Sequence, residues 1–446
     1  MRADPVAVSP VPPSSGTWPS HVKPTSEFLA AHEYLREGKG HLFVTGRAGT
    51  GKSTLLKCLR DLLEDKMVVV APTGLAAVNV GGQTIHSFFG LPPRLIRKDD
   101  IRRSRNARIM RKLKFVVVDE VSMVRSDLMW AIDQSLRINR GKSREPFGGV
   151  RLAMFGDLHQ LPPVVNEGEM AAHLETEHGG PFFFDVGSLR EGRGTALIEL
   201  SEVFRQRDQA LIDVLNKVRD GEAGEDDLAL LNERVHPIRT LSEGEPYVIL
   251  VPTNAAAKRI NDAYLAHLDG RAETYQASLT GEFNDSAQPT DASLVLKRGA
   301  KVMLLRNDPD RRWVNGTIAR VSRVEPDKVW VEIDGEEHEV ERVSWENRRY
   351  AYDKELETVV ETVAGTFKQF PLKLAWALTI HKSQGLTLDK VYIDLGRGTF
   401  AHGQAYVALS RCRTLEGLAL ARPLRPSDIL FDPAVMGYRR VFETLA

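Results

Sequence analysis

The chain has 446 residues, of which 42% are hydrophobic and 27% charged, as in ordinary soluble globular proteins. Its 60 Lys and Arg balance its 60 Asp and Glu, so the net charge gives no argument for a nucleic-acid partner. Its two cysteines exclude a disulfide framework and a zinc site, which favours a reducing cytoplasm. At about 150 residues per domain, the length predicts about three structural units.

The first 24 residues are rich in Pro and Ser and lack the apolar segment of a signal peptide. We therefore expect residues 1–24 to be a disordered tail, and the protein to stay in the cytoplasm. No apolar run in the chain approaches the roughly 20 residues that span a bilayer, so we expect no membrane partner.

Short apolar runs then alternate with helical patterns. Val, Leu and Phe runs of this kind, bounded by turn residues, are typical of parallel strands buried on both faces. Alternating strands and helices predict a doubly wound parallel-sheet α/β domain, which we place at residues 25–190. The runs are HLFVTG (41–46), MVVVAPT (67–73), FVVVD (115–119) and RLAMFGD (151–157).

The segment RLIRKDDIRRSRNARIMRKLK (94–114) concentrates positive charge, with ten Lys and Arg against Asp99 and Asp100. Such a run is either a solvated helix face or a segment that contacts phosphates. The sequence leaves both interpretations open.

The second half repeats part of the first. VVVAPTG (68–74) and VILVPTN (248–254) share an apolar strand that runs into Pro-Thr and a small turn residue. With the strand-like LKLAWAL (372–378) and KVYIDL (390–395), they predict a second α/β core resembling the first.

Residues 300–345 have a different pattern. KVWVEIDGEEHEV (328–340) alternates apolar and polar residues around Asp334-Gly335, which indicates a hairpin with a primed turn. We therefore expect a small antiparallel β-module inserted into the second core.

The segment GRAGTGKST (46–54) follows a strand directly, precedes a Leu-rich helical pattern and matches G-x-x-x-x-G-K-[ST]. The backbone of such a loop and the following helix N-terminus bind phosphates. Lys52 would reach the β- and γ-phosphates of ATP, and Ser53 would hold Mg²⁺. Nucleotide contacts are expected from Gly46, Ala48, Gly49, Thr50, Gly51, Lys52, Ser53 and Thr54.

Acidic residues end the third apolar run. Asp119 is expected to hold Mg²⁺, and Glu120 to orient and deprotonate the attacking water. Gln160 follows another strand end, where it could sense the γ-phosphate. Arg205 and Arg411 are candidates to stabilise the charge of the transition state, with a structural salt bridge as the alternative for each.

In order, these motifs resemble those of superfamily 1 helicases, and most closely the Pif-type and RecD-like enzymes of superfamily 1B. The resemblance covers roughly residues 25–425. It rests on GRAGTGKST, APTGLAAVNVGGQTIHSFF, VVVDEVSM, FGDLHQLPPV, LSEVFRQRD, LAWALTIHKSQGLTLDKV and AYVALSRCRTLEGL, and on DEVSMVRSDLMWAIDQSLRINR (119–140).

The resemblance implies two RecA-like domains, at 25–190 and at 191–305 with 369–446. It also implies a short wedge insertion at 91–112 and an SH3-like module at 306–368. The implied activity is ATP- and Mg²⁺-dependent 5′→3′ movement on single-stranded DNA, with unwinding at junctions with duplex and often of G-quadruplex DNA. We expect a monomer, associated with a bacterial nucleoid.

Strand ends with small hydroxyls and exposed N–H groups suit the backbone phosphates of single-stranded DNA. One grip per core would let a strand pass as the cleft opens and closes. For any single Thr, a local turn cap is the alternative. The first core offers Pro72, Thr73, Gly74, Thr84, His86, Ser87, Phe88 and His159, and the second offers Thr253 and Asn254.

The segment HKSQG (381–385) follows a predicted strand of the second core. No nucleophile partner and no metal spacing surrounds it, so we interpret it as a two-sided coupling turn. His381, Lys382 and Ser383 would face DNA, while Gln384 and Gly385 would approach the nucleotide.

The chain departs from the family pattern in one respect. Such helicases usually carry a Gln upstream of the phosphate loop that reads adenine, and residues 24–46 contain none. Either another group reads the base, or selectivity for ATP is loose. The alternative functions are an NTP-dependent switch or clamp that binds nucleic acid without unwinding, and a superfamily 1 RNA helicase.

Overall fold

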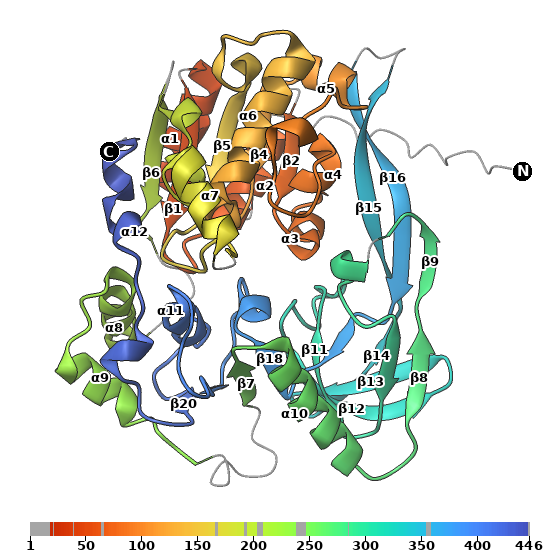
Figure 1. Ribbon diagram of the computed structural model, residues 1–446. Helices are drawn as coiled ribbons and strands as arrows, with labels where there is room; N and C mark the ends of the chain where they lie inside the picture. Colours follow the sequence, from red (N-terminus) through yellow and green to blue (C-terminus); the bar gives the residue numbers. More distant parts are fainter. Residues whose placement is uncertain are drawn as a thin grey trace, which may run out of the picture.

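A computed structural model of the chain describes residues 18–20, 22–38, 40–63, 67–165, 168–190, 194–202, 208–237, 247–283, 285–353 and 358–444. Three bodies are visible in Figure 1: a first α/β core at the top, a second at the lower left and a β-module at the lower right. Most of the predicted tail lies outside the described residues.

The first core is a parallel sheet with both faces buried. Leu42 and Val44 of its central strand enter one apolar cluster, while Phe43 enters the cluster on the opposite face. This is the burial that the continuous apolar runs predict. In sheet order the strands are β21 (Glu443–Thr444), β6 (Thr195–Leu200), β1 (His41–Gly46), β5 (Arg151–Phe155), β4 (Phe115–Val118), β2 (Met67–Ala71) and β3 (Gln83–Thr84).

Helices cover both faces of this sheet (Figure 1). α1 and α2 bury Phe28, Leu35 and Leu59 against one face, and α6 buries Met129 and Ile132 against the other. The helices are α1 (Ser26–Glu37), α2 (Lys52–Leu62), α3 (Gly74–Asn79), α4 (Ile85–Phe89), α5 (Ala107–Lys112), α6 (Ser126–Arg140) and α7 (Glu169–His178), with short 3-10 turns at Lys98–Asp100, Val121–Met123, Pro146–Gly149, Phe183–Asp185 and Gly187–Leu189.

The second core holds a parallel sheet in the order β18 (Ala377–Thr379), β7 (Val248–Val251), β19 (Val391–Ile393) and β20 (Leu418–Leu420). Its apolar core includes Leu215, Leu250 and Leu409. Its helices are α8 (Gln209–Asp220), α9 (Glu225–Asn232), α10 (Asn254–His267) and α11 (Gln404–Leu409), with 3-10 turns at His381–Ser383 and Pro426–Asp428. The following α12 (Pro433–Gly437) and the 3-10 turn Tyr438–Arg440 bury Val435 and Tyr438 in the first core instead.

The β-module is antiparallel, as expected. Its predicted hairpin turns at Asp334 (φ 52°) and Gly335 (φ 85°), the left-handed pair that a primed two-residue turn requires. One sheet contains β11 (Lys301–Leu304), β12 (Ile318–Glu325), β13 (Lys328–Ile333), β14 (Glu336–Val340) and β17 (Leu372–Leu374); the others contain β8 (Glu273–Gln276) with β10 (Ser293–Leu296), and β9 (Ser278–Gly281) with β15 (Val343–Asp353) and β16 (Thr358–Gln369).

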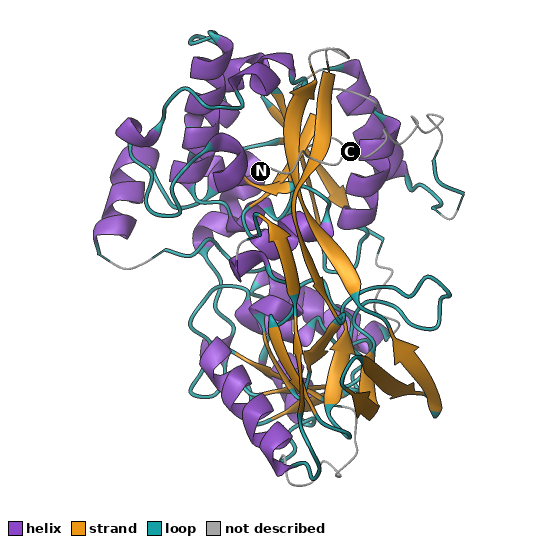
Figure 2. Ribbon diagram, turned by 90° about the vertical axis from the view of Figure 1, so that its right-hand side faces the viewer, coloured by secondary structure: helices purple, strands orange, loops and turns teal. Residues whose placement is uncertain are grey.

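The long β15–β16 hairpin reaches up from the module along the first core (Figures 1 and 2). The Tyr350 hydroxyl accepts a hydrogen bond from the Val69 N–H at 2.9 Å. Its ring meets Phe88 edge to face, with centroids 5.9 Å apart. A side chain of the module therefore belongs to the apolar core of the first domain.

These sheets confirm the predicted fold class of two parallel α/β cores with an inserted β-module. The domain boundaries stay predictions, and sheet membership differs from them in places. β6 and β21 belong to the first sheet, although residues 195–200 and 443–444 lie beyond the predicted end at 190. β11 and β17 flank the expected module and join its sheet.

The expected strand LKLAWAL is divided. Residues 372–374 pair with β11 of the module, and residues 377–379 pair with β7 of the second core. Ala375 donates its N–H to the Lys301 carbonyl between them, so the chain passes from one sheet to the other at this point. A single apolar run cannot show which of two sheets each of its ends will join.

The C-terminal segment returns to the first core. β21 pairs in parallel with β6, and Phe442 packs against Phe43 with ring centroids 5.3 Å apart. Tyr438 lies on the same ring at 6.2 Å. The chain thus connects the two cores twice, once after β6 and once before β21.

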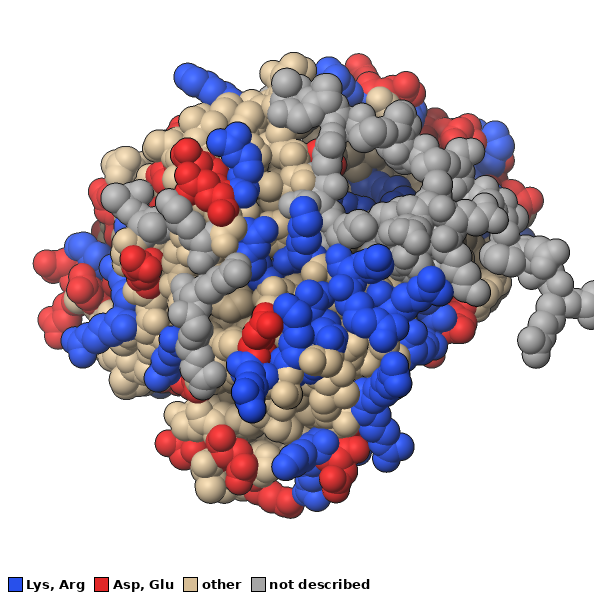
Figure 3. Space-filling view, turned by 90° about the horizontal axis from the view of Figure 1, so that it is seen from above, with Lys and Arg blue, Asp and Glu red and all other residues tan. Residues whose placement is uncertain are grey.

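The basic segment forms the 3-10 turn 98–100 and helix α5 at the top of Figure 1. Arg94 pairs with Asp100 at 2.6 Å, which neutralises one charge. Seen from above, Lys and Arg side chains gather over this end of the molecule (Figure 3). The exposed residues of the segment's second half are Arg102, Arg103, Arg105, Arg108, Arg111, Lys112 and Lys114.

Candidate functional site

The phosphate loop lies between β1 and α2, as the motif predicts. Gly49 (φ 88°) and Gly51 (φ 86°) adopt left-handed backbone conformations that favour glycine. A Cβ on Gly46 would lie 2.7 Å from the Leu200 carbonyl oxygen, so a side chain there would displace β6. The loop can therefore wrap closely around a phosphate chain.

Lys52 opens α2 and lies against this loop. Its ammonium donates to the carbonyl oxygens of Gly46 at 2.6 Å and Arg47 at 3.0 Å. The side chain is therefore held across the loop, where it can reach a bound phosphate by exchanging these partners. Ser53 and Thr54 follow on the exposed first turn of the helix.

The acidic pair follows β4. Glu120 has a left-handed backbone (φ 50°), an uncommon conformation for a residue with a Cβ. Burial, the adjacent Asp119 and Asp157 raise the pKa of Glu120 to about 7 against the opposing charge of Lys52. Burial also raises the pKa of Asp119 to about 6. The site therefore contains two carboxyls that would gain from a nearby cation.

Side-chain amides connect the two cores at this point. The Gln384 amide donates to the Gln160 oxygen at 2.9 Å and to the Glu120 carboxylate at 3.4 Å. Gln160 in turn donates to Asp157 at 3.0 Å. The predicted approach of Gln384 to the nucleotide side is therefore present as direct contact with two predicted catalytic residues of the first core.

Arg411 is buried in the second core and faces the same place. Its guanidinium donates to the carbonyl oxygens of Val407 at 2.8 Å, Ser383 at 3.3 Å and Leu386 at 3.2 Å. It also lines the cavity beside the phosphate loop. Arg411 thus fixes the 383–386 turn onto α11 while placing a positive charge at the nucleotide cleft.

A cavity of about 670 Å³ separates the two cores, within the range of about 300–1,000 Å³ that small-molecule sites occupy. Both cores contribute to its wall, so most of the predicted nucleotide site comes together. It is lined by Val22, Lys23, Phe28, Ala48, Gly49, Thr50, Gly51, Lys52, Ser53, Thr54, Glu120, Gln160, Gly385, Thr387 and Arg411. Gly46, Asp119 and Gln384 are not among these lining residues.

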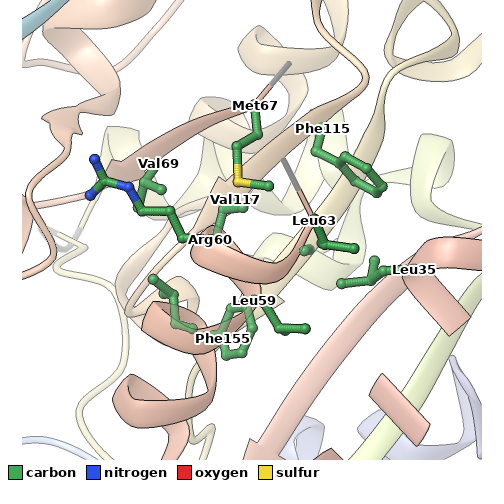
Figure 4. A pocket seen from close by; sticks show the side chains of 11 residues that line it. Leu35, Leu59, Arg60, Leu63, Met67, Val69, Phe115, Val117 and Phe155 are labelled. Atoms are coloured by element: carbon green, nitrogen blue, oxygen red, sulfur yellow. The ribbon is translucent and has the colours of Figure 1, made fainter. Parts of the chain in front are cut away.

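A second, apolar pocket lies inside the first core between α2 and the sheet (Figure 4). Its volume is about 10 Å³, and Leu59, Val117 and Phe155 are among its walls. A void of this size holds at most about one water molecule. It is a packing gap rather than a ligand site.

The charged pair behind the nucleotide cleft escaped the sequence interpretation. Arg219 of α8 is almost fully buried, 3.5 Å from Asp157 and 3.4 Å from Glu199. Burial opposes ionisation of Asp157, but Arg219 and Lys52 hold its pKa below the usual value. The sequence does contain a signal for this buried charge. Arg219 follows Leu215 by four positions, which places an arginine on the apolar face of a helix.

Three threonines predicted to grip DNA cap helices. The hydroxyl oxygens of Thr73, Thr84 and Thr253 each accept the backbone N–H three residues on, at 3.2 Å. The local cap that was the alternative is therefore present at each one. A capping hydroxyl keeps its own hydrogen, so it can still donate to a phosphate.

Other predicted DNA residues differ in accessibility. Phe88 and Ser383 are fully buried, and the Ser383 hydroxyl donates to the Ile380 carbonyl. His159 is buried as well, with Nδ1 2.9 Å from the Arg219 carbonyl oxygen. These three side chains face the protein interior in this arrangement of the domains. Phe88 lies in the apolar core of the first domain, while His159 and Ser383 contact backbone carbonyls of the second core.

The remaining predicted residues stay near the surface. Lys382, Thr253 and Asn254 are exposed, and Pro72, Ser87 and His381 are partly buried. Burial lowers the pKa of His86 and of His381. Arg205 lies outside the described residues. No helix in the part of the chain that the structure describes is long and apolar enough to cross a membrane.

The geometry can be compared with known proteins. A family model described as PIF1-like helicase matches residues 29–227. The ATP-dependent DNA helicase Pif1 of Bdellovibrio bacteriovorus is 35% identical over 444 residues, which cover 97% of this chain and 95% of that protein. The chain belongs to the PIF1-like helicase family. The zebrafish helicase PIF1 is also 35% identical, but this chain spans only 62% of its length.

Solved structures of this family share the fold. Bacteroides Pif1 in complex with ADP-AlF4 superposes with a TM-score of 0.85 at 37% identity, covering 93% of this chain and 96% of that one. The TM-score is 0.86 for the unliganded Bacteroides protein, whereas it is 0.67 for the complex of Bacteroides Pif1 with single-stranded DNA. The domain arrangement of this chain is therefore closer to the two structures described without DNA.

Proposed function

We propose that the protein is an ATP-dependent DNA helicase that couples hydrolysis between its two cores to movement along single-stranded DNA. The observation that supports this best is the shared cavity. The phosphate loop, Glu120 and Gln160 come from the first core, while Gly385, Thr387 and Arg411 come from the second. Any change in the bound nucleotide would therefore alter contacts across the cleft.

The residues fit ATP and Mg²⁺. The hydroxyl of Ser53 and the carboxylate of Asp119 are hard oxygen donors, and the raised pKa of Asp119 indicates a buried carboxyl that a cation would stabilise. Bound there, Mg²⁺ would offset charge on the β- and γ-phosphates.

Hydrolysis follows from the neighbouring side chains. Glu120 orients a water whose oxygen attacks the γ-phosphorus, and it takes the proton of that water. The bond between the γ-phosphorus and the β–γ bridging oxygen breaks, leaving ADP. Lys52 and Arg411 stabilise the charge that spreads over the phosphoryl oxygens. Arg205 remains a further candidate for that role.

The DNA track in this proposal uses both Pro-Thr turns and the 381–385 turn. Support comes from the family, since Bacteroides Pif1 has been solved with single-stranded DNA. In the first core we propose contacts from Pro72, Thr73, Gly74, Thr84, His86 and Ser87, and in the second from Thr253, Asn254, His381 and Lys382. The buried Phe88, His159 and Ser383 act by supporting these turns.

Finer features rest on the family resemblance. We propose 5′→3′ polarity, activity on G-quadruplex DNA, a monomeric state and work at a bacterial nucleoid. The exposed basic residues of 102–114 would contact duplex phosphates at the junction. A forked duplex is the DNA named for one structure of two coordinating Pif1 helicases, which supports a junction as substrate.

The deciding experiment compares unwinding of matched duplexes that carry either a 5′ tail or a 3′ tail, together with ATPase activity with and without single-stranded DNA. We expect DNA to stimulate hydrolysis and only the 5′-tailed duplex to be opened. Preference for the 3′ tail would overturn the polarity. Stimulated ATPase without unwinding would indicate the clamp, and stimulation by RNA alone would indicate an RNA helicase.

A further inference from the structure

The nucleotide cavity has two chemically different ends, which the sheet order defines. In the first sheet β1 lies between β5 and β6. Glu120 and Gln160 follow β4 and β5, on one side of the phosphate loop. Helix α1, with Val22 and Lys23 just before it, packs along β1 and β6 on the other side. The γ-phosphate belongs at the first end, so the base belongs at the second.

The base end is mostly apolar. Phe28 of α1 is 3% exposed, and Trp18 stacks against it with ring centroids 6.1 Å apart and planes 26° apart. Val22 adds a second apolar wall, in a turn closed by its N–H and the Pro19 carbonyl at 2.9 Å. Phe28 therefore has a fixed ring that a nucleotide base can contact.

Lys23 is the only polar side chain among the described residues that line this end. An ammonium donates hydrogen bonds but accepts none. The 6-amino group of adenine is a donor and needs an acceptor, which a Gln or Asn carboxamide supplies together with a donor for N7. Guanine offers acceptors at O6 and N7, and Lys is a suitable partner for both.

We propose that this enzyme does not select adenine. The base is held by apolar contact with Phe28 and Val22, and Lys23 donates to acceptors on the base edge, so ATP and GTP are both substrates. This inference deepens the proposed function and rests on it. Hydrophobic contact alone discriminates weakly between similar ligands, whereas a hydrogen-bonding site rejects a mismatched ligand by about 10⁴–10⁵-fold.

The first test compares nucleotides on the full-length protein. With saturating single-stranded DNA, we expect kcat/KM for ATP and GTP to agree within about tenfold. A preference for ATP of about a hundredfold or more would overturn the inference and would indicate that a backbone carbonyl reads the amino group. Displacement of a fluorescent ADP analogue by ADP and by GDP gives the same comparison without hydrolysis. If both diphosphates compete equally but DNA stimulates no hydrolysis, the helicase proposal fails and the base inference stands.

Two variants test the residues. Lys23→Ala removes an exposed side chain and should weaken GDP binding by about tenfold while changing ADP binding less. An equal effect on both diphosphates, or none, would overturn the role of Lys23. Phe28→Gln introduces a carboxamide at the base end and should raise the preference for ADP over GDP.

A matched control separates selectivity from packing. Phe28→Leu keeps an apolar wall, so it should weaken both diphosphates alike without creating a preference. Because Phe28 is buried, thermal unfolding of both variants must first show a folded protein. If Phe28→Gln is folded and shows the wild-type ratio of ADP to GDP affinity, Phe28 does not face the base and the inference is wrong.

Discussion

The two Pro-Thr turns are nearly identical locally and different in their surroundings. Thr73 and Thr253 have extended backbones, with φ −117° and −124°, and each caps the helix that follows. Thr253 and its neighbour Asn254 are exposed. The first turn is covered, because a Cβ on Gly74 would lie 2.7 Å from the Cα of Ala287 in the loop between β9 and β10.

This difference separates what a short sequence determines from what the tertiary structure adds. The cap follows from a threonine at a strand end, so it appears in both cores. Access to the cap depends on a loop more than 200 residues away in the chain. The second turn is therefore ready for a phosphate, while the first must lose the Ala287 contact before DNA can reach Gly74.

The largest expected effect is at Arg411, the positively charged side chain that the second core contributes to the nucleotide cavity. We expect Arg411→Ala to reduce the rate of ATP hydrolysis by about 10³-fold or more, because the charge at the γ-phosphate is lost. Binding of a fluorescent ADP analogue should persist. The buried carbonyls that Arg411 contacts require a check of thermal unfolding; a protein that neither folds nor binds ADP would indicate a structural role instead.

Lys52 carries the corresponding charge in the first core. Lys52→Ala should reduce DNA-stimulated ATP hydrolysis by about 10²–10³-fold, since one stabilising donor to the phosphates disappears. Steady-state ATPase assays with saturating single-stranded DNA measure the effect. Lys57, on the exposed side of α2, provides the matched control, and an equal loss in Lys57→Ala would contradict the assignment.

The turns themselves can be compared directly. Thr253→Ala should weaken binding of single-stranded DNA by about fivefold to tenfold, and Thr73→Ala should weaken it less, because the first turn is covered. Fluorescence anisotropy with labelled DNA resolves this difference. Thr→Ser at each position keeps the hydroxyl and the cap and should behave like the wild type. A larger loss at Thr73 would show that DNA binding displaces the covering loop at little cost.

The smallest expected effect concerns the β15–β16 hairpin, which packs against the first core through Tyr350. Tyr350→Phe removes the acceptor for the buried Val69 N–H and should lower the free energy of unfolding by about 1–3 kcal/mol. Urea unfolding measures this change. Tyr264, an exposed tyrosine on α10, serves as the control position; equal stability of Tyr350→Phe and wild type would contradict the burial of this contact.

Much of the fold could be predicted because it depends on short-range patterns. Apolar runs 41–46 and 115–119 gave buried parallel strands, and Asp334-Gly335 gave the hairpin. The placement of β21 beside β6 could not be predicted, since a two-residue strand has no periodicity and its partner lies more than 240 residues away. The separation of β17 from β18 could not be predicted either, because the two ends of one apolar run join different sheets.

The candidate site divides in the same way. The phosphate end is encoded by contiguous residues such as Gly49, Gly51 and Lys52, so the motif alone is enough to predict it. The proposed base end is not encoded by a motif, because Val22 and Phe28 carry no polar group that a motif could specify. The Arg219–Asp157 pair joins α8 to the loop after β5, and only folding brings these residues together.

The C-terminal return has a mechanical consequence. The backbone crosses from the first core to the second after β6 and returns before β21. The two cores are therefore joined by two backbone connections rather than one. A single tether would allow them to drift apart in any direction, whereas two tethers leave rotation about the line between the crossings as the easiest displacement. We therefore expect cleft opening to be a rotation of limited range, with Phe442, packed on Phe43, holding the second connection against the first core.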